Sequence, residues 1–483
     1  MMASVRQSVV YASVSRYLLV AIGLVSTVVV ARLLTPSELG IWAIGSSMVM
    51  IISEFRLLGA GIYIVREPEL TESKIRSALG VTYLISWGLG GLLVLASPFI
   101  AGFYQIAELE PLFYLLSVSF FLAPFVSIPC ALLERAMDFR TLGMIWVAGV
   151  TMGLVVTIGG ILLGLSFYAL ALGLGANTMT QVAFANLRVR KRYWWPWFHR
   201  IVPVVRLGIY SSASGMMKKS LLNVPDMIIG KLGTTTQVGL FSRGLGFVEF
   251  LSSSVQQGIS PVVLPYLSGK VRERENVANA YLNAGVMLGA ILWPVLAVAA
   301  VSSLPVIRFF FGDQWDQAAP LASVLAIWAM LRCVHVLLPE LLLSTGREKL
   351  LLIREFVLLT VCVLGLLLLF RFGLLMAAGT FVLVGLVDVA LGGWIVRQRF
   401  ALAPARVLRA WLPNMALAGL CALVAWSLVN GLALASAPPW QAVTVLAVVL
   451  VPVWYLGLWL LRNPLWEEVQ PARVKAVFRA RHG

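Results

Sequence analysis

The chain has 483 residues, of which 60% are hydrophobic and only 12% are charged, and its mean hydropathy is +0.92. Soluble domains carry roughly 25% charged residues, so this composition excludes a protein whose main solvent is water. The net charge of +16 would favour nucleic-acid binding in a soluble protein, but in a membrane protein the positions of the charges report topology instead.

Apolar runs long enough to cross a bilayer recur along the whole chain. A helix needs about 20 apolar residues to span a hydrocarbon core of about 30 Å, because its backbone polar groups must be satisfied internally. We therefore predict an all-α polytopic membrane protein of about fourteen transmembrane helices. The fourteen runs lie at 9–30, 39–60, 77–98, 112–133, 142–164, 167–187, 206–228, 238–262, 278–301, 319–343, 351–370, 374–396, 411–433 and 440–461.

Most of the 37 lysines and arginines fall in alternate loops and in the two terminal segments. The opposite loops hold only four basic residues, Arg32, Lys231, Arg308 and Arg371. Because basic loops stay on the cytoplasmic side, we predict that both termini are cytoplasmic.

The loop richest in basic residues is RVRKRYWWPWFHR at 188–200. Its Trp194, Trp195 and Trp197 favour the headgroup region of a membrane, beside the basic cluster. A topology signal combined with an aromatic belt is the simpler interpretation of this loop, and a specific lipid-binding site is the alternative.

An internal repeat appears at a constant offset of 199 residues. ARLLTPSELGIWAIG at 31–45 aligns without gaps on GKLGTTTQVGLFSRG at 230–244, and a weaker echo pairs ERAMDFRTL at 134–142 with LSTGREKLL at 343–351. Repeats of this kind are typical of transporters. We predict two parallel six-helix halves, at 1–200 and 201–400, followed by helices 13 and 14 with a cytoplasmic tail at 401–483.

Two consecutive segments resemble a known family. ARLLTPSELGIWAIG, followed by ISEFRLLGAGIYIVRE at 52–67, is similar to the signature of bacterial polysaccharide transporters. The closest class is the Wzx-type flippase of the multidrug/oligosaccharidyl-lipid/polysaccharide exporter superfamily. FFFGDQW at 309–315 and LSTGREK at 343–349 extend the resemblance to the superfamily level.

The resemblance implies an inverted V of two six-helix lobes around a hydrated cavity. It also implies that an undecaprenyl-diphosphate-linked oligosaccharide is flipped from the cytoplasmic to the periplasmic leaflet of a bacterial inner membrane by alternating access. The glycan would be an O-antigen, capsule or exopolysaccharide repeat unit. Expected partners are this lipid-linked glycan, membrane lipids and other polysaccharide-assembly membrane proteins; no cofactor, metal or nucleic acid is expected.

Ionisable residues inside the apolar runs are the candidate site residues, because each costs several kcal/mol in a bilayer unless protein or water surrounds it. Lys218 and Lys219 lie near the middle of the seventh run, and Lys219, Asn223 and Asp226 recur on one helical face. Fixed cations suit a diphosphate or an anionic sugar. The alternative is that Lys219 pairs with Asp226 or another acid to hold helices together.

Further candidates lie in other runs. His335 is three residues from Arg332 and could gate on proton uptake, or it is a hydrogen-bonded core residue. Arg56 could snorkel to the membrane surface instead of binding substrate. The predicted substrate-binding residues are Arg16, Lys218, Lys219, Asn223, Arg332, Arg56 and Arg243. The predicted residues for ion coupling or charge balance are Asp226, Glu249, Glu340, Asp388 and His335.

Other function classes fit less well. A peptidoglycan-precursor flippase also has fourteen helices, but the signature after the first helix is of the polysaccharide type. A cation-coupled drug exporter normally has an acidic residue in its first helix, where this chain offers only Arg16. A membrane glycan polymerase or ligase needs a sizeable periplasmic loop with catalytic residues, and the connection at 302–318 is short. We therefore predict a transporter and not an enzyme.

The predicted topology can be tested with a reporter that is active only in the periplasm. When it is fused after Gly483 it should stay silent, because the tail is predicted to be cytoplasmic. A fusion in the loop near Arg371 serves as the positive control, and an active reporter at Gly483 contradicts the orientation.

Overall fold

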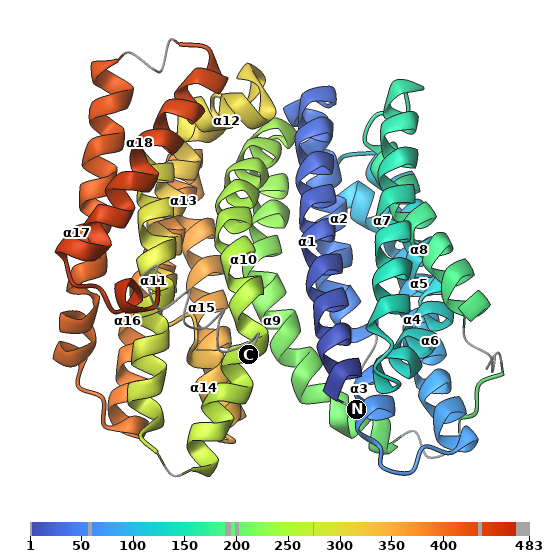
Figure 1. The fold of residues 1–483 in the computed structure, drawn as a ribbon. Helices are drawn as coiled ribbons and strands as arrows, with labels where there is room; N and C mark the ends of the chain where they lie inside the picture. The colour runs from blue at the N-terminus through green and yellow to red at the C-terminus, as the bar shows by residue number, and fades with distance from the viewer. Residues whose placement is uncertain are drawn as a thin grey trace. The chain divides into compact units, whose positions relative to one another are not determined.

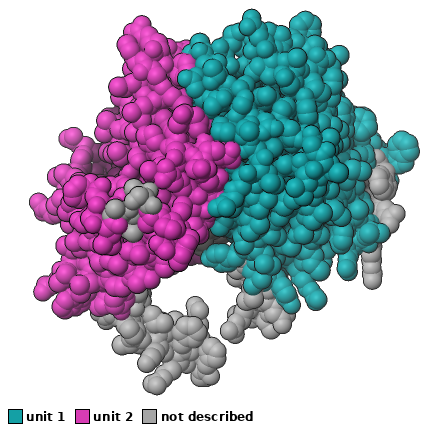
Figure 2. Space-filling model, turned by 90° about the horizontal axis from the view of Figure 1, so that it is seen from above, with its two compact units in different colours: residues 1–239 teal, residues 240–483 magenta. Residues whose placement is uncertain are grey.

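The computed structural model describes residues 2–56, 60–188, 195–198, 202–273, 275–432 and 437–469, and every regular element among them is a helix (Figure 1). The chain divides into two compact units, Met1–Gly239 and Leu240–Gly483, coloured teal and magenta in Figure 2. The structural boundary therefore falls about one helix later than the repeat boundary at residue 200, because the seventh predicted helix packs with the first unit.

The first unit is built from nine helices and the start of a tenth. Within it α2 packs against α9, α4 against α5, and α7 against both α1 and α8. The helices are α1 (Met2–Leu33), α2 (Pro36–Arg56), α3 (Ala60–Arg66), α4 (Glu72–Tyr104), α5 (Leu109–Leu122), α6 (Pro124–Arg135), α7 (Phe139–Leu162), α8 (Tyr168–Arg188), α9 (Val202–Leu232) and α10 (Thr235–Arg272).

The second unit contains the rest of α10 and the remaining helices. Within it α11 packs against α17 and α13, and α16 packs against α13 and α15. The helices are α11 (Val277–Val301), α12 (Ser303–Phe311), η1 (Asp313–Trp315), α13 (Ala318–Cys333), α14 (Leu338–Ser344), α15 (Glu348–Leu369), η2 (Phe370–Phe372), α16 (Leu374–Phe400), α17 (Pro404–Gly431), α18 (Pro439–Leu460) and α19 (Pro464–Val469).

Ten helical segments in the described part are long and apolar enough to cross a membrane, and the bent pair α5 and α6 makes eleven. The protein is therefore an all-α, multi-span membrane protein. The other three predicted spans are α8, α9 and α10, which have 21, 31 and 38 residues. They are long enough to span but more polar than the rest, so the total of fourteen stays a prediction.

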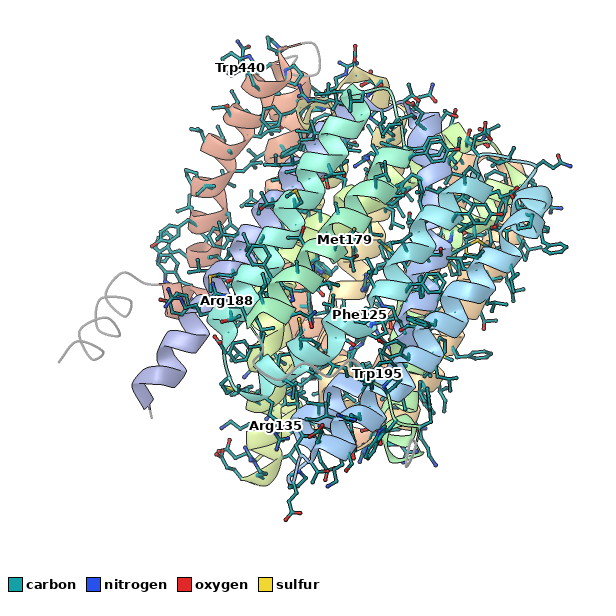
Figure 3. All side chains as sticks on the ribbon, turned by 90° about the vertical axis from the view of Figure 1, so that its right-hand side faces the viewer. Phe125, Arg135, Met179, Arg188, Trp195 and Trp440 are labelled. Carbon is teal, nitrogen blue, oxygen red and sulfur yellow. The ribbon has the colours of Figure 1, made fainter. Side chains whose placement is uncertain are left out.

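Large apolar side chains cover the outside of the described helices. Phe99 on α4 is 80% exposed and Leu163 after α7 is 83% exposed, as expected for side chains that face lipid. Figure 3 shows Met179 on the outside of α8, and Arg135 and Trp195 toward one end of the first unit.

Two predicted spans are broken at prolines. In the fourth span α5 ends at Leu122 and α6 begins at Pro124, with a bend of 42°. In the tenth span α13 ends at Cys333 and α14 begins at Leu338, with Pro339 in its first turn. Proline is favoured at the start of a helix, where its missing N–H costs nothing. The corresponding spans of the two repeat halves therefore share a break.

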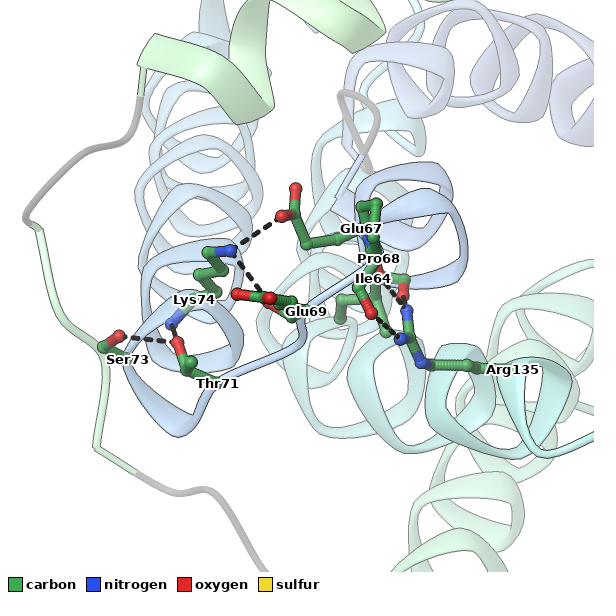
Figure 4. Close-up of polar contacts among 8 residues, drawn as sticks. All are labelled: Ile64, Glu67, Pro68, Glu69, Thr71, Ser73, Lys74 and Arg135. Carbon is green, nitrogen blue, oxygen red and sulfur yellow. Dashed lines mark hydrogen bonds and ion pairs between the residues drawn. The ribbon is translucent and has the colours of Figure 1, made fainter.

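The second predicted span corresponds to α2, and the short helix α3 follows it. Ser86 of α4 donates a hydrogen bond to the Arg56 carbonyl at the end of α2. Arg135 of α6 donates to the carbonyls of Ile64, Glu67 and Pro68 at the end of α3 (Figure 4). The last carbonyls of a helix lack intrahelical partners, so these two side chains stabilise both helix ends.

The 199-residue repeat has the same backbone geometry in both copies. α1 ends at Leu33 and α2 begins at Pro36, while α9 ends at Leu232 and α10 begins at Thr235. Thr35 and Glu38 form reciprocal side-chain to backbone hydrogen bonds, and Thr234 and Gln237 form the same two bonds. Each copy is therefore a capping box, in which threonine and Glu or Gln satisfy each other's backbone N–H groups.

The weaker echo is also a shared backbone motif. Met137 and Gly346 occupy aligned positions, and both have a positive φ, of 57° and 68°. The next residue of each copy donates a hydrogen bond back to the carbonyl five residues earlier, from Asp138 to Leu133 and from Arg347 to Leu342. This pattern is the Schellman motif that ends a helix, so both echoes correspond to local structure.

The two capping boxes lie against each other within the first unit. A Cβ atom on Gly40 would overlap the carbonyl oxygen of Thr235, and a Cβ atom on Gly239 would overlap that of Pro36. The Ser37 and Thr235 hydroxyls also share a hydrogen bond of 2.7 Å. Only glycine allows this reciprocal approach of α2 and α10.

Replacing Gly40 with alanine should therefore destabilise the protein by about 1–3 kcal/mol, the usual cost of overpacking. Gly88 of α4 is the matched control, because nothing lies within 4 Å of a Cβ atom there. Thermal unfolding of the purified variants in detergent measures the difference. Equal unfolding temperatures for the two variants would show that the contact is not tight.

Candidate functional site

Two polar contacts join α2 and α9 in the first unit. The Ser47 hydroxyl donates to the Asp226 carboxylate over 2.8 Å, and both residues are buried. Further along, the Lys219 ammonium lies 2.6 Å from the Glu54 carboxylate. The helices are antiparallel here, so Asp226 and Lys219 both contact α2, as a shared helical face requires.

The other polar residues of this stretch behave differently. The Asn223 side chain donates to the Lys219 carbonyl within α9, so it completes its own helix. Lys218 is exposed and forms no ion pair with any carboxylate in the described part of the chain. The two neighbouring lysines therefore differ. Lys219 forms an ion pair with Glu54, whereas Lys218 forms none with a described carboxylate.

Arg56 at the end of α2 lies against α5 instead of an acid. Its guanidinium is 5.7 Å from the centre of the Phe120 ring and donates a long hydrogen bond of 3.5 Å to the Ser119 carbonyl. Its Nε atom is buried and has no hydrogen-bond partner among the described residues. Arg16 of α1 is exposed and also forms no ion pair with a described carboxylate.

Arg332 and Glu249 form an ion pair in the second unit, as Lys219 and Glu54 do in the first. The Arg332 guanidinium of α13 lies 3.0 Å from the Glu249 carboxylate of α10, with side-chain exposures of 18% and 29%. The same guanidinium lies 5.2 Å from the centre of the Trp328 ring. Two residues predicted for different roles are thus brought together, and Glu249 neutralises Arg332.

Arg243 of α10 is held by aromatic rings. Its guanidinium lies 4.9 Å from the Phe311 ring and 5.1 Å from the Trp315 ring, both in the FFFGDQW segment. Its Nε atom is buried without a hydrogen-bond partner in the described part of the structure. Cation–π contacts hold a guanidinium without neutralising it, so Arg243 keeps its positive charge.

The nearby Asp316 is occupied by another arginine. Arg308 donates two hydrogen bonds to the Asp316 carboxylate, over 2.7 and 2.6 Å. Arg308 lies in α12, outside the membrane-spanning segments, and the hydrogen bond to Asp316 raises the pKa of its guanidinium. This pair fixes η1 against α12 and so positions the Trp315 ring that contacts Arg243.

A fully buried charge cluster lies between α15 and α16. Arg354 donates two hydrogen bonds of 2.8 Å to the Asp388 carboxylate and one of 2.8 Å to Glu355. All three residues are less than 10% exposed. With one guanidinium and two carboxylates, the trio carries an excess of one negative charge when both acids are ionised.

His335 lies beside this cluster, at the break between α13 and α14. Its Nδ1 atom shares a hydrogen bond of 2.7 Å with the Tyr281 hydroxyl, and its ring packs against Gly392. It also hydrogen-bonds the Val389 backbone, and it is only 2% exposed. These contacts favour the interpretation of His335 as a hydrogen-bonded core residue. Glu340 lies in the first turn of α14 and interacts electrostatically with the Tyr281 hydroxyl.

Sequence reasoning missed four residues of these contacts, namely Glu54, Tyr281, Arg354 and Glu355. One signal was available: Arg354 and Asp388 lie at equal sequence distances from Arg371, in the tight turn between α15 and α16. In an antiparallel helix pair, two charges at equal sequence distances from the turn lie at the same depth in the membrane. No comparable signal links Glu54 to Lys219, because α2 and α9 are distant in sequence.

The described residues contain no group of three or more His, Cys, Asp or Glu side chains placed to hold a metal ion. The contacts described above are those of charged side chains. They can bind an anion, balance its charge or link helices.

Comparison with known proteins gives a family match. A family model described as "Polysaccharide biosynthesis protein" matches residues 29–320. The chain is 23% identical to the teichuronic acid biosynthesis protein TuaB of Bacillus subtilis, over 70% of this chain and 71% of TuaB. It is 22% identical to the lipopolysaccharide biosynthesis protein WzxC of Escherichia coli, over 70% of this chain and 69% of WzxC.

Solved structures share the fold. The lipid II flippase MurJ in an inward closed conformation matches with a TM-score of 0.72 and 12% identity, over 92% of this chain and all of MurJ. An inward-facing multidrug resistance MATE transporter matches with a TM-score of 0.66 and 14% identity, over 79% of this chain and 94% of the transporter. The chain therefore has the fold of these transporters.

Replacing Asp388 with asparagine should destabilise the protein by about 3–5 kcal/mol, because it removes one partner of a buried ion pair. Glu275→Gln is the control: it removes the carboxylate from an ion pair of 2.6 Å with Lys270, whose side chains are 26% and 53% exposed, and it should have little effect on stability. Unfolding in detergent measures both. Similar losses for the two variants would contradict the importance of burial.

Proposed function

Because this chain belongs to the polysaccharide biosynthesis protein family, we propose that it flips an undecaprenyl-diphosphate-linked oligosaccharide across the bacterial inner membrane. The glycan faces the cytoplasm before transport and the periplasm after it. The transported oligosaccharide is one repeat unit of an O-antigen, a capsule or an exopolysaccharide. The protein exposes the substrate to each side of the membrane in turn, with both termini in the cytoplasm.

The observation that carries this proposal is the presence of cations without acidic partners on membrane-embedded helices. Arg56 and Arg243 each keep a buried Nε donor that no described residue satisfies. Arg16 and Lys218 form no ion pair with a described carboxylate. An unneutralised charge in a membrane is costly, so its retention supports an anionic cargo such as a diphosphate.

The remaining predicted residues take supporting roles in this proposal. Lys219, Asn223 and Arg332 belong to the substrate path, with Glu249 balancing the charge of Arg332. Asp226, Glu340, Asp388 and His335 are the candidates for ion coupling, and the carboxylate excess around Asp388 supports a bound proton or cation there. Other polysaccharide-assembly membrane proteins would receive the flipped product.

A peptidoglycan-precursor flippase is the second candidate, favoured by the match to MurJ over nearly the whole chain. At 12% identity that match carries the fold alone. The family match points to polysaccharide precursors instead, so the two candidates differ in which lipid-linked glycan is moved.

Deletion of the gene should cause a lipid-linked oligosaccharide to accumulate with its glycan on the cytoplasmic side, measured by lipid extraction and mass spectrometry. Restoring the wild-type gene should remove the accumulated lipid. Accumulation of the peptidoglycan precursor instead would favour the second candidate. Normal lipid pools after deletion would contradict both.

Complementation with variants then tests the unneutralised cations. Arg243→Gln should lower glycan export at least about tenfold, the effect expected when a charged binding contact is lost. Arg371→Gln is the matched control, because Arg371 also contacts an aromatic ring, Phe372, but lies in the η2 turn. Equal export by both variants, at equal membrane levels, would exclude Arg243 from the substrate path.

A further inference from the structure

The positive charge of Lys219 is already matched within the protein by Glu54. The ammonium and the carboxylate are 2.6 Å apart, and their side chains are 43% and 26% exposed. The carboxylate lies close to Gly215, one turn before Lys219 on α9, where a Cβ atom would come within 2.5 Å of Glu54 Oε2. Gly215 thus leaves the room that brings Glu54 against α9.

The neighbouring charges are directed elsewhere. Arg56, two residues after Glu54, turns toward Ser119 and Phe120 of α5. Asp226, two turns further along α9, accepts a hydrogen bond from Ser47. Among the described side chains, Glu54 is therefore the carboxylate within ion-pair distance of Lys219.

The exposure of this pair separates it from the cluster at Arg354. Arg354 and Asp388 have side-chain exposures of 5% and 3%, so no external anion reaches them without opening the helix pair. Lys219 and Glu54 are both partly exposed. An exposed ion pair contributes little to stability, so it can exchange one partner for another at small cost.

We propose that Glu54 is a resident counter-ion that the anionic headgroup of the substrate must displace from Lys219. This inference rests on the proposed function, because it takes a lipid diphosphate as the cargo. A diphosphate carries more negative charge than a monophosphate and competes better with a carboxylate for an ammonium. Glu54 therefore sets a threshold that favours diphosphate-linked lipids over monophosphate-linked ones.

The threshold set by Glu54 reduces binding of lipids that carry only a monophosphate. A lipid monophosphate with the same apolar tail carries fewer negative charges than the corresponding diphosphate. Without Glu54, Lys219 would attract either headgroup. With Glu54 in place, the monophosphate gains little by displacing one anion with another.

The test measures binding of undecaprenyl diphosphate and undecaprenyl phosphate to the purified full-length protein in nanodiscs. Wild type should prefer the diphosphate. Glu54→Gln should bind the monophosphate about tenfold more tightly, the size of effect expected for one charge contact, and should gain less for the diphosphate. The ratio of the two affinities should therefore fall, a change that a purely structural loss would not cause.

Two further variants complete the experiment. Glu67→Gln is the matched control, because it removes the carboxylate of a similar ion pair with Lys74, at 2.7 Å, in the α3–α4 turn (Figure 4); its ratio should equal that of wild type. Lys219→Gln should weaken diphosphate binding, because it leaves Glu54 without its cation, and adding Glu54→Gln should restore part of that binding.

The outcomes are distinguishable. If wild type binds both lipids but Glu54→Gln leaves their affinity ratio unchanged, the role of Glu54 is overturned while the proposed function stands. If wild type binds neither lipid, the proposed substrate class itself is wrong. The unfolding temperature of the Glu54→Gln variant verifies that it is folded.

Discussion

A charged side chain on a membrane-embedded helix needs either a partner or a polar cargo, and this constraint organises the structure. Partners are found between helices: Glu54 and Lys219 join α2 to α9, Glu249 and Arg332 join α10 to α13, and Arg354 and Asp388 join α15 to α16. The buried pair of Arg354 and Asp388 holds its two helices together, whereas the pair of Lys219 and Glu54 is partly exposed. The exposure of each pair, and not pairing alone, therefore distinguishes structural charges from those that a substrate can reach.

The helices and their turns could be predicted from sequence because their causes are local. Apolar length defines a span, and a threonine followed three residues later by Glu or Gln defines a helix start, as at Thr35 and Thr234. The breaks at Pro124 and before Pro339 also follow from single residues. The helices α8 to α10 were also predicted, but polar residues interrupt their apolar runs, so their crossing of the membrane stays a prediction.

The candidate site was predictable only in part, because partners come from distant segments. Sequence marks Lys219, Arg332 and Asp388 as unusual, since each is a charge in an apolar run. It does not show that Glu54 neutralises Lys219, or that aromatic rings hold Arg243. Arg354 lies near the start of the predicted run 351–370 and was not among the candidate residues, whereas α15 begins at Glu348 and buries it.

The reciprocal contact of Gly40 and Gly239 limits how far the sequences of the two turns can change independently. Each glycine makes room for the backbone of the other copy, so neither copy of the turn can gain a side chain there by itself. A chain divided at the repeat boundary would separate the two turns, whereas division after Gly239 keeps them on one fragment. The two aligned segments thus pack within one compact unit, and the sequence of each turn is constrained by the backbone of the other.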